Sequence, residues 1–393
     1  MALIRINIPK KKLRVKLACD FRSFMNFGDF MEAGPNHCRK LVLHLDVNNT
    51  VFIGDSITKS VTPEETLNEY LSENAWGTID EGGNWKSADE MCVKPPSDKM
   101  ISYYKFAEAK YQGMPRSEFK KHVRSFTDNK MFRPFRKFYD QMIAALEFPG
   151  DIKTANGVQL PSFKDKQGVP YHKIVPSFYE LLGNLCKSKR DFAIVYRTFG
   201  NDGQAVLQVT KDLLSEGHVA FYNPQDTTGS GDPVGNQGHE VLFTNGTIMR
   251  SNGQITVKCP ENNRKLTNLS DIYKYFSQAN GIKLFVEDYD WWKSQNFHSS
   301  AGKPLLVDPN DDSVHHIMFD DNFRPWEPED SIVDTLQATK DGSFVSVDPA
   351  SFEDVCVVKA DLYQSICNRN YFIEKIRLCE RNYSKFIAGS KNC

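Results

Sequence analysis

One short segment, LVLHLDVNNT at residues 41–50, constrains the fold more than any other part of this chain. Its apolar run has few polar interruptions, which is typical of a strand buried on both faces of a sheet, and such strands belong to α/β architectures. In open α/β sheets, ligands bind beyond the carboxyl ends of the strands. Asp46, Asn48 and Thr50 therefore lie at a candidate site, although a strand that ends in an ordinary turn has the same local pattern.

A second apolar segment, FAIVYRTFG at residues 192–200, follows a helical pattern at residues 176–189. It predicts another buried strand, with Thr198 and Gly200 at its end. Together with Thr50, these two residues are candidate contacts for a substrate. Thr198 is also compatible with a simpler role, in which its hydroxyl only caps the following turn.

A third apolar segment, HHIMFDDN, ends in the adjacent carboxylates Asp320 and Asp321. Two neighbouring like charges at the end of a buried strand are costly unless a cation or a hydrogen-bond donor compensates them. Lys303, in a GKP triplet before this segment, is one candidate cation. Lys293, after a pair of tryptophans, is the competing candidate, and either could be an ordinary surface lysine.

The ordered series of Asp46, Thr198, Lys303 and the two adjacent aspartates resembles the haloacid dehalogenase (HAD) superfamily of phosphatases and phosphotransferases. The resemblance covers about half of the chain. It implies an α/β fold with a Rossmann-like core, a parallel sheet and an inserted cap, and a mechanism that passes through an aspartyl phosphate. By this resemblance Asp46 is the nucleophile, Thr198 donates its hydroxyl to a phosphoryl oxygen, and Lys303 pairs with the phosphate and with Asp46.

Such a mechanism needs the negative charge of the substrate to be neutralised, and Mg²⁺ is the expected cofactor. Mg²⁺ prefers octahedral oxygen ligands with few protein carboxylates. Asp46, the backbone carbonyl of Asn48, and Asp320 or Asp321 could supply them together with waters. The expected substrate is a small phosphorylated compound.

Asn48 departs from the pattern of the family, whose phosphatases usually carry a second Asp two residues after the nucleophile. That Asp protonates the leaving group, which Asn cannot do, and general acid catalysis contributes typically 10²–10⁴-fold. Three explanations remain open. The substrate has a good leaving group; or the protein is a phosphotransferase or uses another acid, such as His44, His315 or His316; or it is a catalytically silent protein that binds metal and a phosphorylated ligand in a regulatory role.

The spacing of these motifs predicts the domain organisation. Residues 40–55 and 174–393 form the expected core, residues 56–173 the inserted cap, and residues 1–39 an unassigned N-terminal extension. Within the core, residues 223–239 are rich in Gly, Pro, Asp and Asn and predict a loop. Residues 240–258 predict a hairpin that decorates the core, with strands around two Asn-Gly turns.

The cap is expected to be mainly helical. Thr62, Pro63 and Glu65 form the start signal of one helix, and a further helical stretch is predicted over residues 117–145. Arg136 in that stretch could present a cation to a phosphorylated substrate. The same pattern is typical of an amphipathic helix whose charged side chains face solvent.

Composition narrows the expected partners. With 49 basic and 50 acidic residues the formal net charge is −1, so neither nucleic acid nor an anionic membrane is an expected partner. The short basic run KKKLRVK at residues 10–16 keeps nucleic-acid binding as a third alternative. Nine scattered cysteines without a CxxC pair, and the lack of an apolar stretch of about 18 residues, predict a cytoplasmic location.

Overall fold

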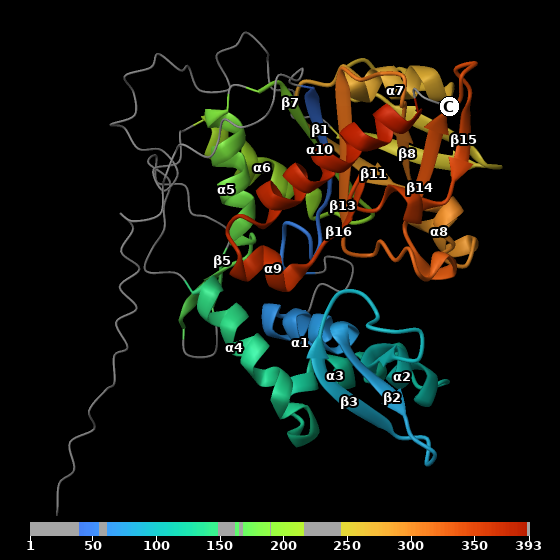
Figure 1. Cartoon of the computed structure of the whole chain (residues 1–393). Coiled ribbons are helices and arrows are strands. Elements are labelled where there is room, and N and C mark those ends of the chain that lie inside the picture. The colour runs from blue at the N-terminus through green and yellow to red at the C-terminus, as the bar shows by residue number, and fades with distance from the viewer. Residues whose placement is uncertain are drawn as a thin grey trace, which may run out of the picture. The chain divides into compact units, whose positions relative to one another are not determined.

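The computed structural model describes residues 39–54, 61–147, 162–164, 168–188, 190–215 and 245–390, all within one compact unit (Figure 1). The predictions for residues 1–38 and for the loop at residues 223–239 lie outside the described residues. Among the helices of the described ranges, none is long and apolar enough to cross a membrane.

A mixed sheet of eight strands forms the centre of the fold, in the order β10-β9-β8-β11-β7-β1-β13-β16. The six strands β8, β11, β7, β1, β13 and β16 are parallel to one another, whereas β9 is antiparallel to β8 and β10 is antiparallel to β9. The predicted α/β class is therefore confirmed, with a central sheet that is mostly rather than entirely parallel. The bounds are β1 Lys40–Asp46, β7 Phe192–Thr198, β8 Asn245–Ser251, β9 Gln254–Lys258, β10 Lys265–Leu266, β11 Gly281–Glu287, β13 Val314–Asp320 and β16 Val357–Lys359.

Strand β1 lies near the middle of this sheet, between β7 and β13, and both of its faces are buried. Leu41, Leu43 and Leu45 point into one hydrophobic cluster, and Val42 points into the cluster on the opposite face. Both neighbours run parallel to β1, so the carboxyl ends of all three strands meet at one edge of the sheet. This edge carries the polar residues that follow the strands.

Helices cover one face of the sheet, and a helix with a second sheet covers the other (Figure 1). The first face packs against α5 Pro176–Lys187, α6 Gly203–Ser215 and α10 Tyr371–Ser390, with α9 Leu362–Cys367 beside them. The second face packs against α7 Leu269–Ser277 and a three-stranded sheet of β12 Lys303–Val307, β14 Val333–Ala338 and β15 Phe344–Val347. The helix α8 Tyr289–Ser294 precedes β12.

The described residues between β1 and α5 form four α-helices and a small antiparallel sheet in the order β3-β2-β4. The capping box of Thr62 and Glu65 is present at the start of α1. The single helical stretch predicted over residues 117–145 is interrupted, because two 3₁₀ turns separate α3 from α4. The bounds are α1 Pro63–Asn74, β2 Ala75–Ile79, β3 Trp85–Met91, β4 Ile101–Ser102, α2 Tyr103–Lys110, α3 Arg116–Arg124 and α4 Arg133–Leu146, followed by the short pair β5 Ser162–Lys164 and β6 Pro170–His172.

This inserted segment, which the sequence predicts to be a cap, shares one hydrophobic cluster with the central sheet and its helices. Leu67 of α1 and Phe135 of α4 belong to the same buried cluster as Leu43 of β1 and Phe178 of α5. The apolar residues of the turn after β1, among them Val51, are part of it as well. Burial of apolar area therefore holds the inserted segment against the central sheet and its helices.

The hairpin of β8 and β9 corrects the expectation of two Asn-Gly turns and of a merely decorating element. Asn252 and Gly253 form the turn, with φ values of 50° and 78°. Asn245 and Gly246 instead lie in β8, which extends the central sheet by pairing with β11. A Cβ atom at position 246 would lie 2.2 Å from the ring of Phe285, so close packing requires the glycine there.

Candidate active site

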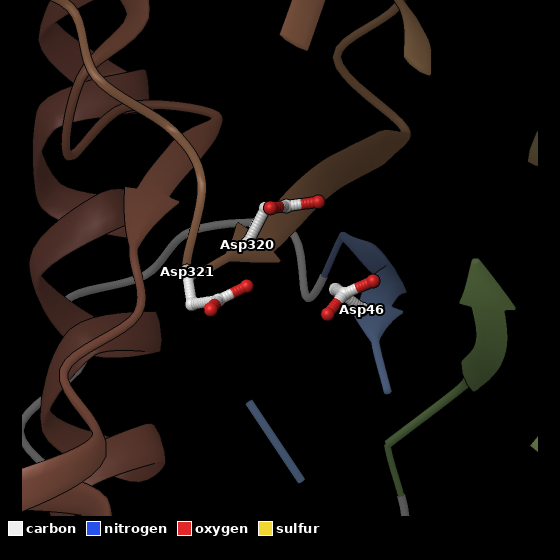
Figure 2. A group of neighbouring side chains, drawn as sticks. All are labelled: Asp46, Asp320 and Asp321. Atoms are coloured by element: carbon white, nitrogen blue, oxygen red, sulfur yellow. The ribbon is translucent and has the colours of Figure 1, made fainter. Parts of the chain in front are cut away.

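Three aspartates from two parallel strands converge at the carboxyl edge of the central sheet. Asp46 ends β1, Asp320 ends β13, and Asp321 follows directly, so the three side chains lie beside one another (Figure 2). One carboxylate oxygen of each lies within 4.8 Å of those of the other two. The structure thus brings together residues that are more than 270 positions apart in the chain.

Lys303 is the cation of this cluster. Its fully buried ammonium donates to Asp46 Oδ1 over 2.5 Å and to Asp320 Oδ2 over 2.8 Å, and to the backbone oxygen of Arg197 over 3.2 Å. Lys303 begins β12, so it reaches the aspartates from the second sheet rather than from the central one. Lys293, the competing candidate, is exposed on α8.

In this cluster, burial and the neighbouring opposite charges shift the pKa values in opposite directions. Burial raises the pKa of Asp46 to about 7, with Lys303 opposing the shift and Asp320 adding to it. Burial, followed by the charges of Asp46 and Asp320, raises the pKa of Asp321 well above its usual value. Burial alone would lower the pKa of Lys303, but the two carboxylates beside it outweigh that effect and raise it. The site therefore has more negative charge than one lysine neutralises.

The turn after β1 presents buried oxygen atoms that lack partners. Val47 accepts backbone hydrogen bonds from Val51 and Phe52, which closes the turn. Asn48 Oδ1, Asn49 Oδ1 and the hydroxyl of Thr50 have no hydrogen-bond partner among the described residues. Buried polar atoms are nearly always satisfied, so three unsatisfied ones directly after Asp46 are expected where a ligand or bound water supplies the partners.

This donor set fits a hard divalent cation. Mg²⁺ binds oxygen at 2.0–2.1 Å, so ligands on opposite sides of the ion are about 4.2 Å apart, and adjacent ligands are closer. The aspartate oxygens, all within 4.8 Å of one another, meet that requirement with small side-chain movements. Asp46, the backbone carbonyl of Asn48, and Asp320 or Asp321 are the residues that would hold the ion.

Thr198 lies at the end of β7, next to β1, and is buried. Its hydroxyl oxygen accepts a hydrogen bond from the backbone N–H of Gly200 over 3.0 Å, so it does cap the following turn. Because a hydroxyl can accept and donate at once, this contact leaves its own hydrogen for a ligand oxygen. Both roles that the sequence left open for Thr198 are thus compatible with the structure.

Arg136 contacts residues outside the aspartate cluster. It is exposed on α4, where it pairs with Asp140 over 2.9 Å and with Asp128 over 3.6 Å and lies over the ring of Tyr139. No contact between this side chain and the aspartate cluster occurs among the described residues. Its position agrees with the alternative of a solvated face on an amphipathic helix.

The three histidines proposed as substitute acids are buried and have other partners. His44 contacts Arg197 and His316, and His315 contacts the backbone oxygen of Val355. Burial lowers the pKa of His44 well below its usual value, and it lowers the pKa of His315 and of His316 to about 3. They are neutral at pH 7, and the structure brings none of them to the Asp46 carboxylate.

Two residues at the site edge carried no signal in the sequence. Lys359 in β16 pairs in register with Asp320 and donates to the backbone oxygen of Asp321. Burial, and then the charge of Arg324, lowers the pKa of Lys359 to about 8. Glu73 of α1 contributes negative charge from the inserted segment, and burial raises its pKa. In the sequence alone, a lysine in a short strand and a glutamate in a helix have the pattern of surface residues.

Arg197, also missed by sequence reasoning, positions Lys303. It is fully buried on β7, and its guanidinium pairs with Glu287 and donates to the backbone oxygen of Pro304 over 3.1 Å. Pro304 follows Lys303 in β12, and the backbone oxygen of Arg197 accepts from the lysine itself. One arginine therefore ties the start of β12 to the central sheet.

Comparisons with family models, with curated proteins and with solved structures find no match to this chain.

Proposed function

We propose that this chain is an HAD-like, Mg²⁺-dependent phosphohydrolase or phosphotransferase, which acts on a small phosphorylated compound through an aspartyl phosphate at Asp46. The observation that carries the proposal is the convergence of Asp46, Asp320 and Asp321 at the carboxyl edge of the parallel strands, with Lys303 paired to Asp46 and Asp320. The strand order supports it, because β1 lies between the strands that end in Thr198 and in Asp320. This edge is where open α/β sheets bind ligands.

Each residue has a role that follows from its position. Asp46 is the nucleophile: one of its oxygens bonds to phosphorus as the bond to the leaving oxygen breaks, and the leaving group departs with the electron pair. Lys303 favours the ionised form of the Asp46 carboxylate and orients it. The Thr198 hydroxyl donates to a phosphoryl oxygen. Bound Mg²⁺ would supply positive charge to the phosphoryl oxygens. Water or an acceptor hydroxyl then takes the phosphoryl group from Asp46.

Asn48 decides which substrates react. The side chain in this position has no proton to give to a leaving oxygen, and the histidines considered as substitutes have other partners. A leaving group of low pKa needs no acid, so aryl, acyl or anhydride phosphates are the expected substrates. The same residue favours the second candidate function, a catalytically silent protein that binds metal and a phosphorylated ligand.

Trapping of the phosphoenzyme tests the proposal. With Mg²⁺ and a ³²P-labelled aryl phosphate, acid quenching should retain label on the wild-type chain, and hydroxylamine should release it, because acyl phosphates react with this nucleophile. Asp46→Asn should carry no label, whereas Asp290→Asn, an exposed acid on α8, should match the wild type. A folded Asp46→Asn protein that is still labelled would overturn the assignment of the nucleophile. Binding of Mg²⁺ without any labelling of the wild type would favour the silent protein.

A further inference from the structure

Two buried histidines, His44 of β1 and His316 of β13, take no part in the phosphoryl chemistry assigned to Asp46. His44 lies two positions before Asp46, so both side chains point to the same face of β1. The ring of His44 contacts Phe276 of α7 there, at 5.5 Å between ring centroids. This is the face that α7 and the second sheet cover, and the second sheet carries Lys303.

Hydrogen bonds join these histidines into one continuous chain. His44 Nδ1 lies 3.2 Å from Nη1 of Arg197, and His44 Nε2 lies 3.1 Å from Nδ1 of His316. The chain ends at Ser277, whose Oγ lies 3.0 Å from Nε2 of His316. All four side chains are buried. The chain therefore runs from α7 through β13 and β1 to β7 without contact with solvent.

The direction of this chain is fixed by its arginine. A guanidinium can only donate, so Nδ1 of His44 must accept from Arg197. The proton of His44 is then on Nε2, and it is donated to Nδ1 of His316. By the same reasoning His316 carries its proton on Nε2 and donates it to Ser277. Both imidazoles are therefore neutral and have the same tautomer.

The arginine end of the chain reaches Lys303. The three sides of the guanidinium have separate acceptors, namely Glu287 at Nε, His44 at Nη1 and the backbone oxygen of Pro304 at Nη2. A planar group that is held on three sides has one orientation. Pro304 follows Lys303 in β12, and the backbone oxygen of the arginine accepts from the lysine ammonium. The orientation of the guanidinium therefore determines where β12 begins.

We propose that His44 and His316 are positioning residues of the active site, which act through Arg197 to fix the place of the Lys303 ammonium beside Asp46. They orient other side chains and touch neither the substrate nor the metal. The effect on catalysis rests on the function proposed above, whereas the effect on Lys303 does not. A displacement of about 1 Å in an orienting group lowers a rate by up to about 100-fold.

The tautomers are the first test. Nitrogen NMR of the full-length protein with ¹⁵N-labelled histidine distinguishes the two neutral forms of each ring, and His44→Gln and His316→Leu assign the signals. Both histidines should carry their proton on Nε2 at neutral pH. A proton on Nδ1 of either ring would break the chain and overturn the proposal.

Two substitutions of His44 separate positioning from packing. Asn places its amide oxygen near the position of Nδ1 and can still accept from Arg197, whereas Gln places its amide near Nε2 and removes that acceptor. With Mg²⁺ and an aryl phosphate, His44→Gln should lower kcat about 10- to 100-fold with little change in KM, and His44→Asn should keep most of the wild-type rate. Equal kcat values for the two variants would overturn the proposal.

A histidine outside the chain provides the control. His315 is also buried on β13, but it contacts the backbone oxygen of Val355 and makes no contact with Arg197 among the described residues. His315→Gln should therefore keep the wild-type kcat per folded molecule. If His44→Gln does not fold, His316→Leu applies the same test, because it removes the acceptor of the His44 proton. It should lower kcat about 3- to 10-fold, and an unchanged kcat would contradict the proposal.

The ammonium of Lys303 gives a readout that needs no turnover. Because it is buried and hydrogen-bonded, its protons exchange slowly and should give a ¹H–¹⁵N signal, which Lys303→Met assigns by its loss. This signal should shift in His44→Gln and stay unchanged in His315→Gln. An unchanged signal in His44→Gln would overturn the positioning role. If the signal shifts while the wild type forms no phosphoenzyme, the proposed function fails and the positioning of Lys303 stands.

Discussion

At the scale of single residues, Lys303 is the most constrained side chain of the site. Its ammonium is fully buried and contacts both Asp46 and Asp320. Removal of one partner from a buried ion pair leaves an uncompensated charge, which typically costs 3–5 kcal/mol. Lys303 therefore stabilises the fold as well as orienting the carboxylates.

Lys303→Met is expected to lower the free energy of unfolding by about 3–5 kcal/mol at neutral pH. Millimolar Mg²⁺ should restore part of this loss, because a bound cation compensates the same carboxylates. Urea unfolding with and without Mg²⁺ measures both effects. Lys293→Met, at an exposed lysine on α8, is the control and should differ little from the wild type. A loss that Mg²⁺ does not reduce would argue against a metal site at these aspartates.

Asn48 gives a second prediction at this scale. Asn48→Asp supplies the missing acid with almost no change of shape, so it should accelerate hydrolysis of alkyl phosphates about 10-fold or more while changing aryl phosphates less. The dependence of rate on leaving-group pKa should become shallower. Steady-state kinetics over a series of phosphate esters measures it. An Asn48→Asp protein that binds Mg²⁺ and phosphate but turns over no ester would favour the silent alternative.

At the level of secondary-structure elements, α1 links the segment inserted after β1 to the C-terminal part of the fold. Tyr70 donates to Asp361 over 2.6 Å, and Asp361 in turn accepts from the backbone N–H of Gln364 at the start of α9. The helix also carries Glu73, whose charge acts on Asp321 and Lys359. The position of α1 therefore affects the electrostatic environment of Asp321 and Lys359.

Thr62→Ala should destabilise the protein by about 1 kcal/mol, because it removes the hydrogen bond that the backbone N–H of Glu65 donates to the Thr62 hydroxyl oxygen at the start of α1. Thermal and urea unfolding measure this loss. Thr78→Ala, at an exposed position of β2, makes the same chemical change without a cap and should stay within about 0.5 kcal/mol of the wild type. Equal effects of the two substitutions would mean that the capping box adds nothing to stability.

For some elements, the local sequence pattern is enough to predict the secondary structure. Residues 41–46 and 192–198 were predicted as buried strands, and the apolar runs alone were enough because a central parallel strand has no polar face. The Asn-Gly pair at positions 252 and 253 forms its turn, but the identical pair at positions 245 and 246 lies in a strand. Pairing with β11 and packing on Phe285 override the local preference at the second site.

At the scale of the whole molecule, buried neutral histidines make stability depend on pH. His315 stacks on Tyr383 at 4.0 Å between ring centroids, and His316 contacts Ser277. The pKa of each is about 3 in the folded protein, against about 6.5 in an unfolded chain. Since the unfolded state binds protons first, their contribution is fully present above pH 6.5 and is lost as the pH falls from 6.5 towards 3.

Each histidine should therefore reduce the free energy of unfolding by roughly 2 kcal/mol between pH 7 and pH 5. His315→Phe keeps the ring stack and removes the titration, so its stability should fall less over this interval than that of the wild type. Asp46, whose pKa is raised to about 7, acts in the opposite direction, with stability gained as the pH falls from 7 towards 4. It is present in both proteins and cancels in the comparison. Parallel curves for the two proteins in urea unfolding at pH 7 and 5 would contradict the prediction.

The α/β class, the buried central strands and the polar residues at their ends could all be predicted from the amino-acid sequence. These features are local, because strand burial and helix capping depend on neighbours within a few positions. Of the candidate site, Asp46, Thr198, Lys303, Asp320 and Asp321 could be selected as residues. The pairing of Lys303 with Asp46 was implied by the family resemblance, but the other contacts could not be predicted.

The tertiary structure alone decided which charged residues meet. The parallel pairing of β1 with β13 sets Asp46 beside Asp320, and the packing of a second sheet brings Lys303 rather than Lys293 to them. Lys359 enters the site, whereas Arg136 lies with its own acidic neighbours on α4. The charges that compensate one another at this buried site are distant in the chain. Only the fold therefore determines which charged residues become partners.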